Sequence, residues 1–488
     1  MIRGIRTIAL AATLALAACG GGGNTTNTVP TPAQLVGGTP TGGALRIAGV
    51  GDSLTAGVQS GALLGVDLPV LGTNAQLGQI GPVQRTQEHG FFALLWQQAN
   101  GTDINALSNP ASSPLPLIGP SALGGLLAPT TAGFPQQVAA FCSGAQTAAN
   151  AFSTALSLRL NPASVPYDVA VPGQTAHEAL YMVGAINDCS ITAANAPGAI
   201  VNLNALVNSE SQSFWPILAS FGQGVTQVQA ALALRPQVAT VWLGHNELLK
   251  FAFSNGTTPV VPTPQSVHDD IKAIVQQLQG AGARVVVGNL FDVTGAAVFI
   301  PQPAYASFIA AGIQRLNPAI PPAAAQAAGT TYANAESAQI GLGPGGLFTI
   351  NAYFKTLQAA AVQGAPPTLT ASDVVFDPVV TQLRSLQVAY NAAIAQAVSE
   401  TGAALADVAT VFKTVQTNGG YPINPPKCCS LVYGGGFFSL DGLHPSNTGY
   451  AVVAKTFIDS LNAAYKLNIA PIDPLIPSIY AADPYAPH

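Results

Sequence analysis

The residues best suited to chemistry lie near the two ends of the chain. Near the start, the sequence Gly-Asp-Ser-Leu at 51–54 follows a short apolar run, which predicts a turn from a strand into a helix at Ser53. A hydroxyl at such a turn stands at the carboxyl end of a sheet, beside the backbone N–H groups of a helix N-terminus. A serine becomes a useful nucleophile only with a base beside it, so the turn requires a partner elsewhere.

The best candidate for that base is His444, in the sequence Asp-Gly-Leu-His at 441–444. An aspartate three residues before a histidine can accept the Nδ1–H of the ring, which leaves Nε2 to take the serine proton. We therefore predict Ser53, His444 and Asp441 as a catalytic triad. We expect the loop that carries Asp441 and His444 to lie at the surface. The donors expected for the oxyanion are the N–H groups of Ser53 and Gly173 and the side-chain amide of Asn246.

The order of these motifs resembles that of the SGNH, or GDSL, hydrolase family. The family has four characteristic residues, and each has a match here in the same order. Ser53 lies in Gly-Asp-Ser-Leu, and Gly173 is the glycine after the second expected strand. Asn246 lies in Gly-x-Asn after the third strand, and His444 ends Asp-x-x-His near the end of the chain. The resemblance covers about residues 44–465, apart from two insertions. It implies ester hydrolysis through an acyl-enzyme, with no metal and no organic cofactor. One departure is Glu247, where the family usually has aspartate.

Several alternatives stay open. Ser53 alone could serve as a helix N-cap. The fold could carry a carbohydrate acetylesterase, or a surface binding module without catalysis. We expect acyl-chain or lipid esters as substrates, because the insertions are apolar and poor in charge. An ordinary α/β-hydrolase is disfavoured, because no glycine closes a G-x-S-x-G elbow around Ser53.

The elements expected to position these residues alternate between strands and helices. Short apolar runs predict strands at 45–50, 169–171, 238–243, 284–290 and 403–408, and helical patterns occur at 210–234, 264–280 and 380–400 and around 450–461. Strands separated by helices predict a five-stranded parallel sheet in a three-layer α/β/α, flavodoxin-like sandwich. Residues 58–160 and 293–375 are long and rich in Ala, Gly and Pro, and we interpret them as insertions over the carboxyl edge of the sheet.

Composition excludes several classes of protein. The chain has 488 residues, of which 49% are hydrophobic and only 8% charged, so it is neither disordered nor a long charged coiled coil. Lys and Arg number 16 against 21 Asp and Glu, a net charge of −5. So few cations make a poor partner for a phosphate backbone, so we expect no nucleic acid, and no protein partner is inferred.

The N-terminal sequence predicts a signal peptide that directs export. Residues 1–18 have the pattern of a signal peptide, with Arg3 and Arg6 near the start and then an apolar run from Ile8 to Ala18 that is too short to span a bilayer. Residues 16–19 resemble a bacterial lipobox, which implies cleavage before Cys19, lipidation of its thiol and an outer-membrane location; an ordinary secretory signal is the alternative. Residues 19–43 predict a flexible tether, 44–470 the hydrolase domain, and 471–488 a Pro-rich surface tail.

Export permits disulfides. Apart from Cys19, the cysteines are Cys142, Cys189, Cys428 and Cys429, which allow three pairings. We favour Cys142 with Cys189 and a vicinal bond between Cys428 and Cys429. A zinc site at the last two is the rival, but no second close pair or nearby histidine completes it.

Overall fold

The computed structural model describes most of the chain from residue 44 onward. The described residues are 44–60, 63, 65, 85–102, 107, 109, 112–118, 159–183, 217–222, 224–257, 261–423 and 428–487.

The central sheet is parallel and buried. Its strands are β1 (Ile47–Gly51), β2 (Val238–Trp242), β3 (Arg284–Gly288) and β7 (Ala404–Ala406), in the order β1-β2-β3-β7. Nearly every residue of these strands is apolar and buried, as expected for a parallel sheet covered on both faces. The α/β/α class is therefore as predicted.

The fifth predicted strand, at 169–171, does not form as a full strand. This segment runs beside β1 and forms one parallel bridge, Gly49 with Asp168. The ladder stops there because the N–H of Gly51, the next donor on β1, bonds to the side chain of Gln227 instead. The sheet has four strands among the described residues for this reason.

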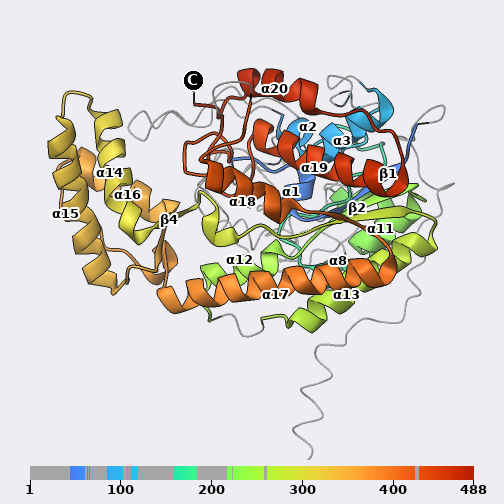
Figure 1. Cartoon of the computed structure of the whole chain (residues 1–488), viewed down its shortest axis with the longest axis horizontal. Helices are drawn as coiled ribbons and strands as arrows, with labels where there is room; N and C mark the ends of the chain where they lie inside the picture. The colour runs from blue at the N-terminus through green and yellow to red at the C-terminus, as the bar shows by residue number, and fades with distance from the viewer. Residues whose placement is uncertain are drawn as a thin grey trace, which may run out of the picture.

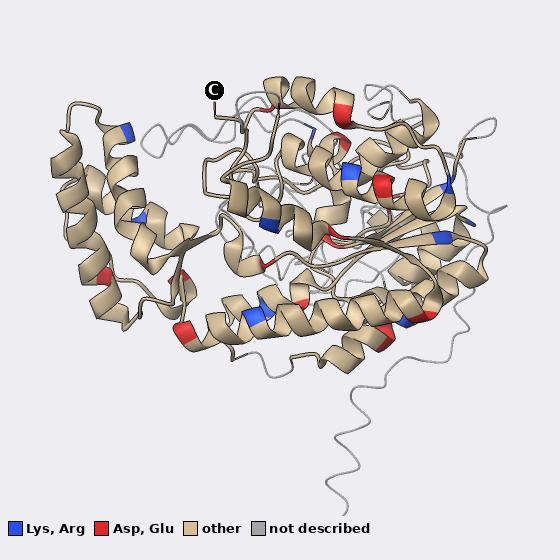
Figure 2. Ribbon diagram, viewed as in Figure 1, with Lys and Arg blue, Asp and Glu red and all other residues tan. Residues whose placement is uncertain are grey.

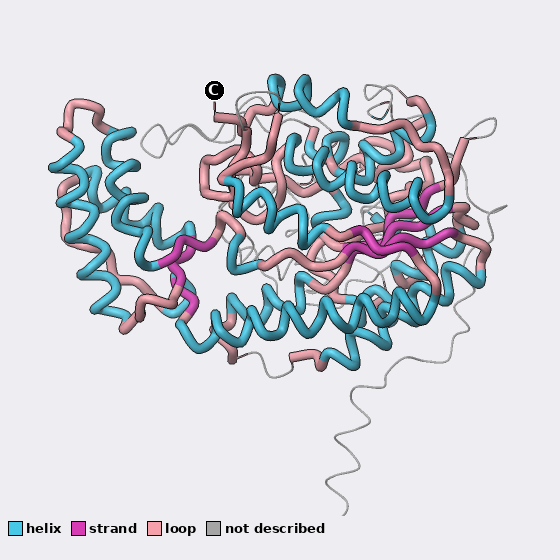
Figure 3. Tube along the Cα trace, in the orientation of Figure 1, coloured by secondary structure: helices cyan, strands magenta, loops and turns pink. Residues whose placement is uncertain are grey.

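Two helical layers cover the sheet (Figures 1 and 3). Below it in Figure 1 lie α8 (Ala176–Tyr181), α12 (His245–Phe253), α13 (Pro264–Gly280) and α17 (Asp377–Thr401), with α11 (Gln227–Ala233) at the right. Above it lie α1 (Ser53–Ala56), α2 (Thr86–His89), α3 (Phe91–Asn100), α18 (Val408–Asn418) and α19 (Asn447–Tyr465).

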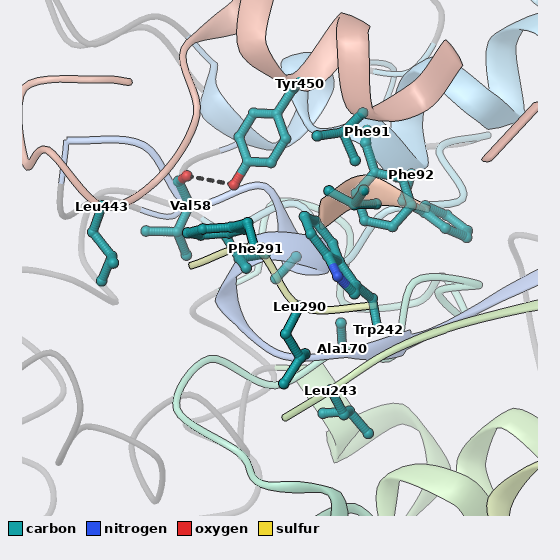
Figure 4. Packing of buried hydrophobic residues seen from close by; sticks show 14 of the residues in the cluster. Val58, Phe91, Phe92, Ala170, Trp242, Leu243, Leu290, Phe291, Leu443 and Tyr450 are labelled. Atoms are coloured by element: carbon teal, nitrogen blue, oxygen red, sulfur yellow. Dashed lines mark hydrogen bonds between the residues drawn. The ribbon is translucent and has the colours of Figure 1, made fainter. Parts of the chain in front are cut away.

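Helix α3 corrects one prediction. It falls inside the expected insertion 58–160, yet it is a core helix, because the Phe91 ring stacks on Phe457 of α19 at 4.6 Å and meets Trp242 of β2 edge-on at 5.4 Å. Figure 4 shows Phe91 and Phe92 among the buried side chains around Trp242. The rest of the interval is described only in short pieces.

The second expected insertion folds as a lobe of its own. It contains β4 (Phe299–Pro301), α14 (Gln302–Leu316), α15 (Pro322–Ile340), β5 (Leu347–Thr349), α16 (Ile350–Ala361) and β6 (Val374–Val375). Its strands form an antiparallel sheet in the order β4-β5-β6. A Cβ at Gly329 of α15 would overlap the carbonyl oxygen of Ala306, so glycine permits the close packing of α14 and α15. In Figure 1 this lobe lies to the left of the main sheet.

The C-terminal segment also differs from the expected surface tail. Residues after α19 form the 3₁₀ turn η6 (Asp473–Leu475) and α20 (Ile476–Ala482), with Ile472 and Ile476 buried. The buried Asp483 accepts hydrogen bonds from the backbone and hydroxyl of Thr448, at 2.8 and 2.7 Å. This segment therefore packs against the start of α19.

The surface carries few charges. Figure 2 shows the Lys and Arg residues of the described part spread over several helices and loops rather than gathered on one face. Within the same residues, no helix is both long and apolar enough to cross a membrane.

Candidate active site

Ser53 lies where β1 passes directly into α1. The side chain of Asp52 caps this helix, and its Oδ1 accepts the N–H of Leu54 at 2.9 Å. A side chain at Gly51 would overlap that of Thr55, so the tight turn requires glycine there. Ser53 is the first residue of the helix, so its N–H has no acceptor within the helix and is available to a ligand.

Asp441 and His444 form a buried pair within one loop. The Oδ2 atom of Asp441 lies 2.7 Å from His444 Nδ1, and its Oδ1 accepts the N–H groups of Leu443 and His444 at 2.8 and 2.9 Å. Burial alone would raise the pKa of the Asp441 carboxyl, but the imidazole and these hydrogen bonds together hold it below its ordinary value. The aspartate therefore stays ionised and fixes the ring.

This loop is not at the surface, contrary to our expectation. His444 is 0% exposed and Asp441 2%. The residues around the pair bury it, because Phe437 and Phe438 before it and Tyr450 after it belong to the hydrophobic core. The Nε2 atom of His444 has no hydrogen-bond partner in the described part of the chain, Ser53 included.

Four hydrogen bonds join the segment that follows Ser53 to the His444 loop and α19. Gln59 Nε2 donates to Asn447 Oδ1 at 2.9 Å, and the Tyr450 hydroxyl donates to the Val58 carbonyl at 2.8 Å (Figure 4). The N–H of Ser60 bonds to Ser439 Oγ at 2.8 Å, and its Oγ accepts the N–H of Leu440 at 3.1 Å. The N–H of Val58 in turn donates to the carbonyl of Ser53 at 3.0 Å. The two distant motifs are thus brought into one neighbourhood.

Asn246 lies in the first turn of α12, at the carboxyl end of β2. Its Nδ2 donates to Asp52 Oδ2 at 3.2 Å and to the carbonyl of Gln174 at 2.9 Å. The amide thus lies beside the Ser53 turn, as the motif order predicts. Both of its hydrogens are engaged, so donation to a substrate oxygen would require an exchange of one bond.

Gly173 lies in a turn closed by the N–H of Gln174, which donates to the carbonyl of Val171 at 3.2 Å. Pro172 precedes it, and its own φ is +84°, the left-handed value that a type II turn places on glycine. The N–H of Val171 bonds to the carbonyl of Gly51 at 3.0 Å, so this turn lies beside the end of β1.

Two buried carboxyl groups flank Asn246. Burial raises the pKa of Asp52 to about 8, with a smaller contribution from the nearby Glu247. Burial likewise raises the pKa of Glu247 to about 7, although its Oε1 accepts the N–H of Ala176 at 2.8 Å. Neither carboxyl therefore ionises as readily as a surface group, and both serve to hold backbone and amide donors in place.

His245 is packed inside the protein. Its ring contacts Trp242 at 5.3 Å and Phe291 at 4.6 Å, and both ring nitrogens lack hydrogen-bond partners in the described residues. Burial lowers its pKa to about 3, so the imidazole is neutral. In this structure it acts as an aromatic core residue.

Two residues that support the site, Gln174 and Gln227, lie outside the sequence motifs and were not predicted. Gln174 contributes the carbonyl that holds Asn246, and Gln227 bonds to both backbone groups of Gly51. Their one sequence signal is a glutamine at an otherwise apolar, buried position, and this signal is weak without the fold.

Of the cysteines, only Cys428 and Cys429 lie among the described residues. Their sulfur atoms are in bonding contact, and Cys429 has a positive φ of 50°. Cys19, Cys142 and Cys189 lie outside the described residues, so the lipidation and the other pairing remain predictions.

The fold and the site together are of the kind that ester hydrolases use: a serine turn, a carboxylate–imidazole pair and amide donors at the carboxyl edge of a parallel sheet. Residues 47–457 match the family described as GDSL-like lipase/acylhydrolase. The chain belongs to this family, and its class of reaction is the hydrolysis of ester bonds.

The chain was also compared with curated protein sequences and with solved structures. Comparison with curated proteins finds no matching sequence. A crystal structure described as a putative GDSL-like lipase, from Parabacteroides merdae ATCC 43184, is 9% identical and gives a TM-score of 0.29 over 86% of this chain and 98% of that one.

Proposed function

We propose that this protein is a serine esterase that hydrolyses carboxylic esters, with Ser53 as nucleophile, His444 as general base and Asp441 as the group that orients the imidazole. The observation that carries the proposal is the buried pair at 2.7 Å with Nε2 unpartnered in the described chain, on a loop bonded to the segment after Ser53. An imidazole held at Nδ1 by a carboxylate, with Nε2 left over, is prepared to take one proton.

The proposed reaction has an acylation step and a deacylation step. Nε2 takes the proton of Ser53 Oγ as that oxygen bonds to the ester carbonyl carbon, and the carbonyl oxygen becomes an oxyanion. The oxyanion accepts hydrogen bonds from the N–H groups of Ser53 and Gly173 and from Asn246. The imidazolium then protonates the departing alcohol as the C–O bond breaks. Water repeats these steps on the acyl-enzyme and releases the acid.

We further propose acyl-chain or lipid esters as the substrates. The support is compositional, because the lobe at 299–375 consists mostly of apolar and small residues and is poor in charge, with the Tyr305 ring stacked on Phe348 inside it. A protein held by a lipid on Cys19, as the lipobox suggests, would work close to such substrates. The anchor and the envelope location are part of this proposal.

A fluorophosphonate probe tests the mechanism. We expect the wild-type protein to be labelled at Ser53, and Ser53→Ala to abolish both labelling and turnover. His444→Ala should abolish turnover while a thermal melt still shows a cooperative transition. A folded wild type that ignores the probe would favour a binding module instead.

Turnover of p-nitrophenyl esters from two to sixteen carbons tests the substrate class. An optimum at medium or long chains is expected. A sharp optimum at acetyl would contradict the acyl-chain preference and favour the carbohydrate acetylesterase.

A further inference from the structure

Gln227 is a fully buried glutamine outside the recognised motifs. It is the first residue of α11, and its side chain bonds to both backbone groups of Gly51, two residues before Ser53. Gly51 N–H donates to its Oε1 at 2.6 Å, and its Nε2 donates to the Gly51 carbonyl at 2.9 Å. A capping box between Thr226 and Gln229 fixes the first turn of α11, and so the origin of this side chain.

The amide of Gln227 replaces a bond that the sheet would otherwise supply. Beside β1, Gly49 N–H bonds to the carbonyl of Tyr167, Val169 N–H to that of Gly49, and Val171 N–H to that of Gly51. Evenly continued, this parallel ladder would pair Gly51 N–H with the carbonyl of Val169. Gly51 N–H goes to Gln227 instead, so a side chain sets where the ladder between β1 and the segment at 168–171 ends.

The same amide belongs to a closed ring of contacts. Gln227 Nε2 also donates to Gln174 Oε1. The carbonyl of Gln174 accepts Asn246 Nδ2, and Asn246 Nδ2 donates to Asp52, which follows Gly51 in the chain. The ring therefore joins the end of β1, the Gly173 turn and the start of α12. These are the three segments that hold the expected oxyanion donors.

We propose that Gln227 is a positioning residue that holds these three segments, and hence the oxyanion donors, in register; the inference rests on the serine esterase function proposed above. Gln227 bonds to none of the reacting groups and acts through Gly51 and Gln174. Without it, Gly51 N–H loses its acceptor in a buried site, and the end of β1 shifts toward the ladder position. A displacement of about 1 Å in such a site costs about a hundredfold in rate.

The test compares Gln227→Met, which keeps the length and loses the hydrogen bonds, with Gln227→Asn, whose amide is one methylene too short to reach. We expect kcat on a p-nitrophenyl ester to fall about 30- to 100-fold in both, with KM within about threefold. The matched control is Gln279→Met at the end of α13, which removes a comparable bond from a glutamine amide to a backbone carbonyl, that of Thr401 at 3.0 Å. It should lower the melting temperature slightly and leave kcat within about twofold.

A double mutant separates positioning from a general loss of structure. If Gln227 acts through the placement of Asn246, Gln227→Met should cost much less in an Asn246→Ala background than in the wild type. The proposal would be overturned if the two substitutions lowered kcat independently, so that the fall in the double mutant equalled the product of the two single falls. It would also be overturned if folded Gln227→Met and Gln227→Asn kept the wild-type kcat.

The two proposals fail in different ways. A wild type that the fluorophosphonate does not label refutes the serine mechanism itself. Labelling at Ser53 together with full turnover by the Gln227 variants refutes the positioning role alone.

Discussion

Gly442, between Asp441 and His444, offers a sharp test of how the loop is held. Its φ is +70°, and its carbonyl accepts the N–H of Val298 at 2.7 Å, from the segment that leads into the lobe. A Cβ at this position would lie 2.6 Å from Val298 N and 2.9 Å from the carbonyl carbon of Ala297. Both are backbone atoms and cannot rotate away.

The expected cost of Gly442→Ala follows from these values. The left-handed backbone costs about 1–2 kcal/mol for a residue with a Cβ. Overpacking against backbone adds about 1–3 kcal/mol, and the strained hydrogen bond about 1 kcal/mol. We therefore expect a loss of about 3–6 kcal/mol in the free energy of unfolding. Because the loop must move, kcat should fall about a hundredfold.

Gly434 provides the matched control, with a φ of +74° and no atom within 4 Å of its would-be Cβ. Gly434→Ala therefore carries the conformational cost of about 1–2 kcal/mol without the overlap. Urea unfolding and ester turnover of both variants separate the two effects. If Gly442→Ala loses no more stability than Gly434→Ala and keeps wild-type kcat, the lobe segment does not hold the loop.

Three further predictions concern the site and its support. Burial raises the pKa of Asp52 from 3.8 to about 8 and that of Glu247 from 4.5 to about 7. The folded state therefore keeps protons that the unfolded state releases, and the free energy of unfolding should fall as pH rises from about 4 to 8. Thermal melts of Glu247→Gln should decline less steeply, and equal slopes would contradict this. Asn246→Ala should lower kcat about a hundredfold with little change in KM; an unchanged kcat would remove Asn246 from the oxyanion site. Tyr433→Phe removes a hydroxyl that donates to the Leu440 carbonyl at 3.2 Å and should cost about 1 kcal/mol in urea unfolding, whereas no change would show that the bond contributes nothing.

Local signals in the sequence predict much of the fold. Helix α13 spans Pro264–Gly280 as expected, because Thr263 caps it, proline opens it, and its apolar residues repeat along one face. Strands β1, β2 and β3 follow from short apolar runs before glycine. The Ser53 turn, the Gly173 turn and Asn246 lie at one edge because the carboxyl ends of neighbouring parallel segments meet there.

What the sequence could not predict depends on long-range contacts. The segment at 169–171 is as apolar as a strand, but Gln227, far along the chain, takes the donor that would extend its ladder. Helix α15 packs through small residues such as Ala325 and Gly329, so no apolar stripe marks it in the sequence. The burial of the His444 loop depends on Phe437, Phe438 and Tyr450 packing around it, which its own polar residues do not indicate.

The bonds between the Ser53 segment and the His444 loop have a consequence for how the enzyme is made. Gln59 and Asn447 are 388 residues apart, so this junction closes only after nearly the entire polypeptide exists. Contacts of such long range form slowly, and the strands of the sheet can assemble before them. A nascent chain that ends before Asp441 would hold the nucleophile without its base. On the proposed mechanism, hydrolysis would begin only once synthesis and folding are complete.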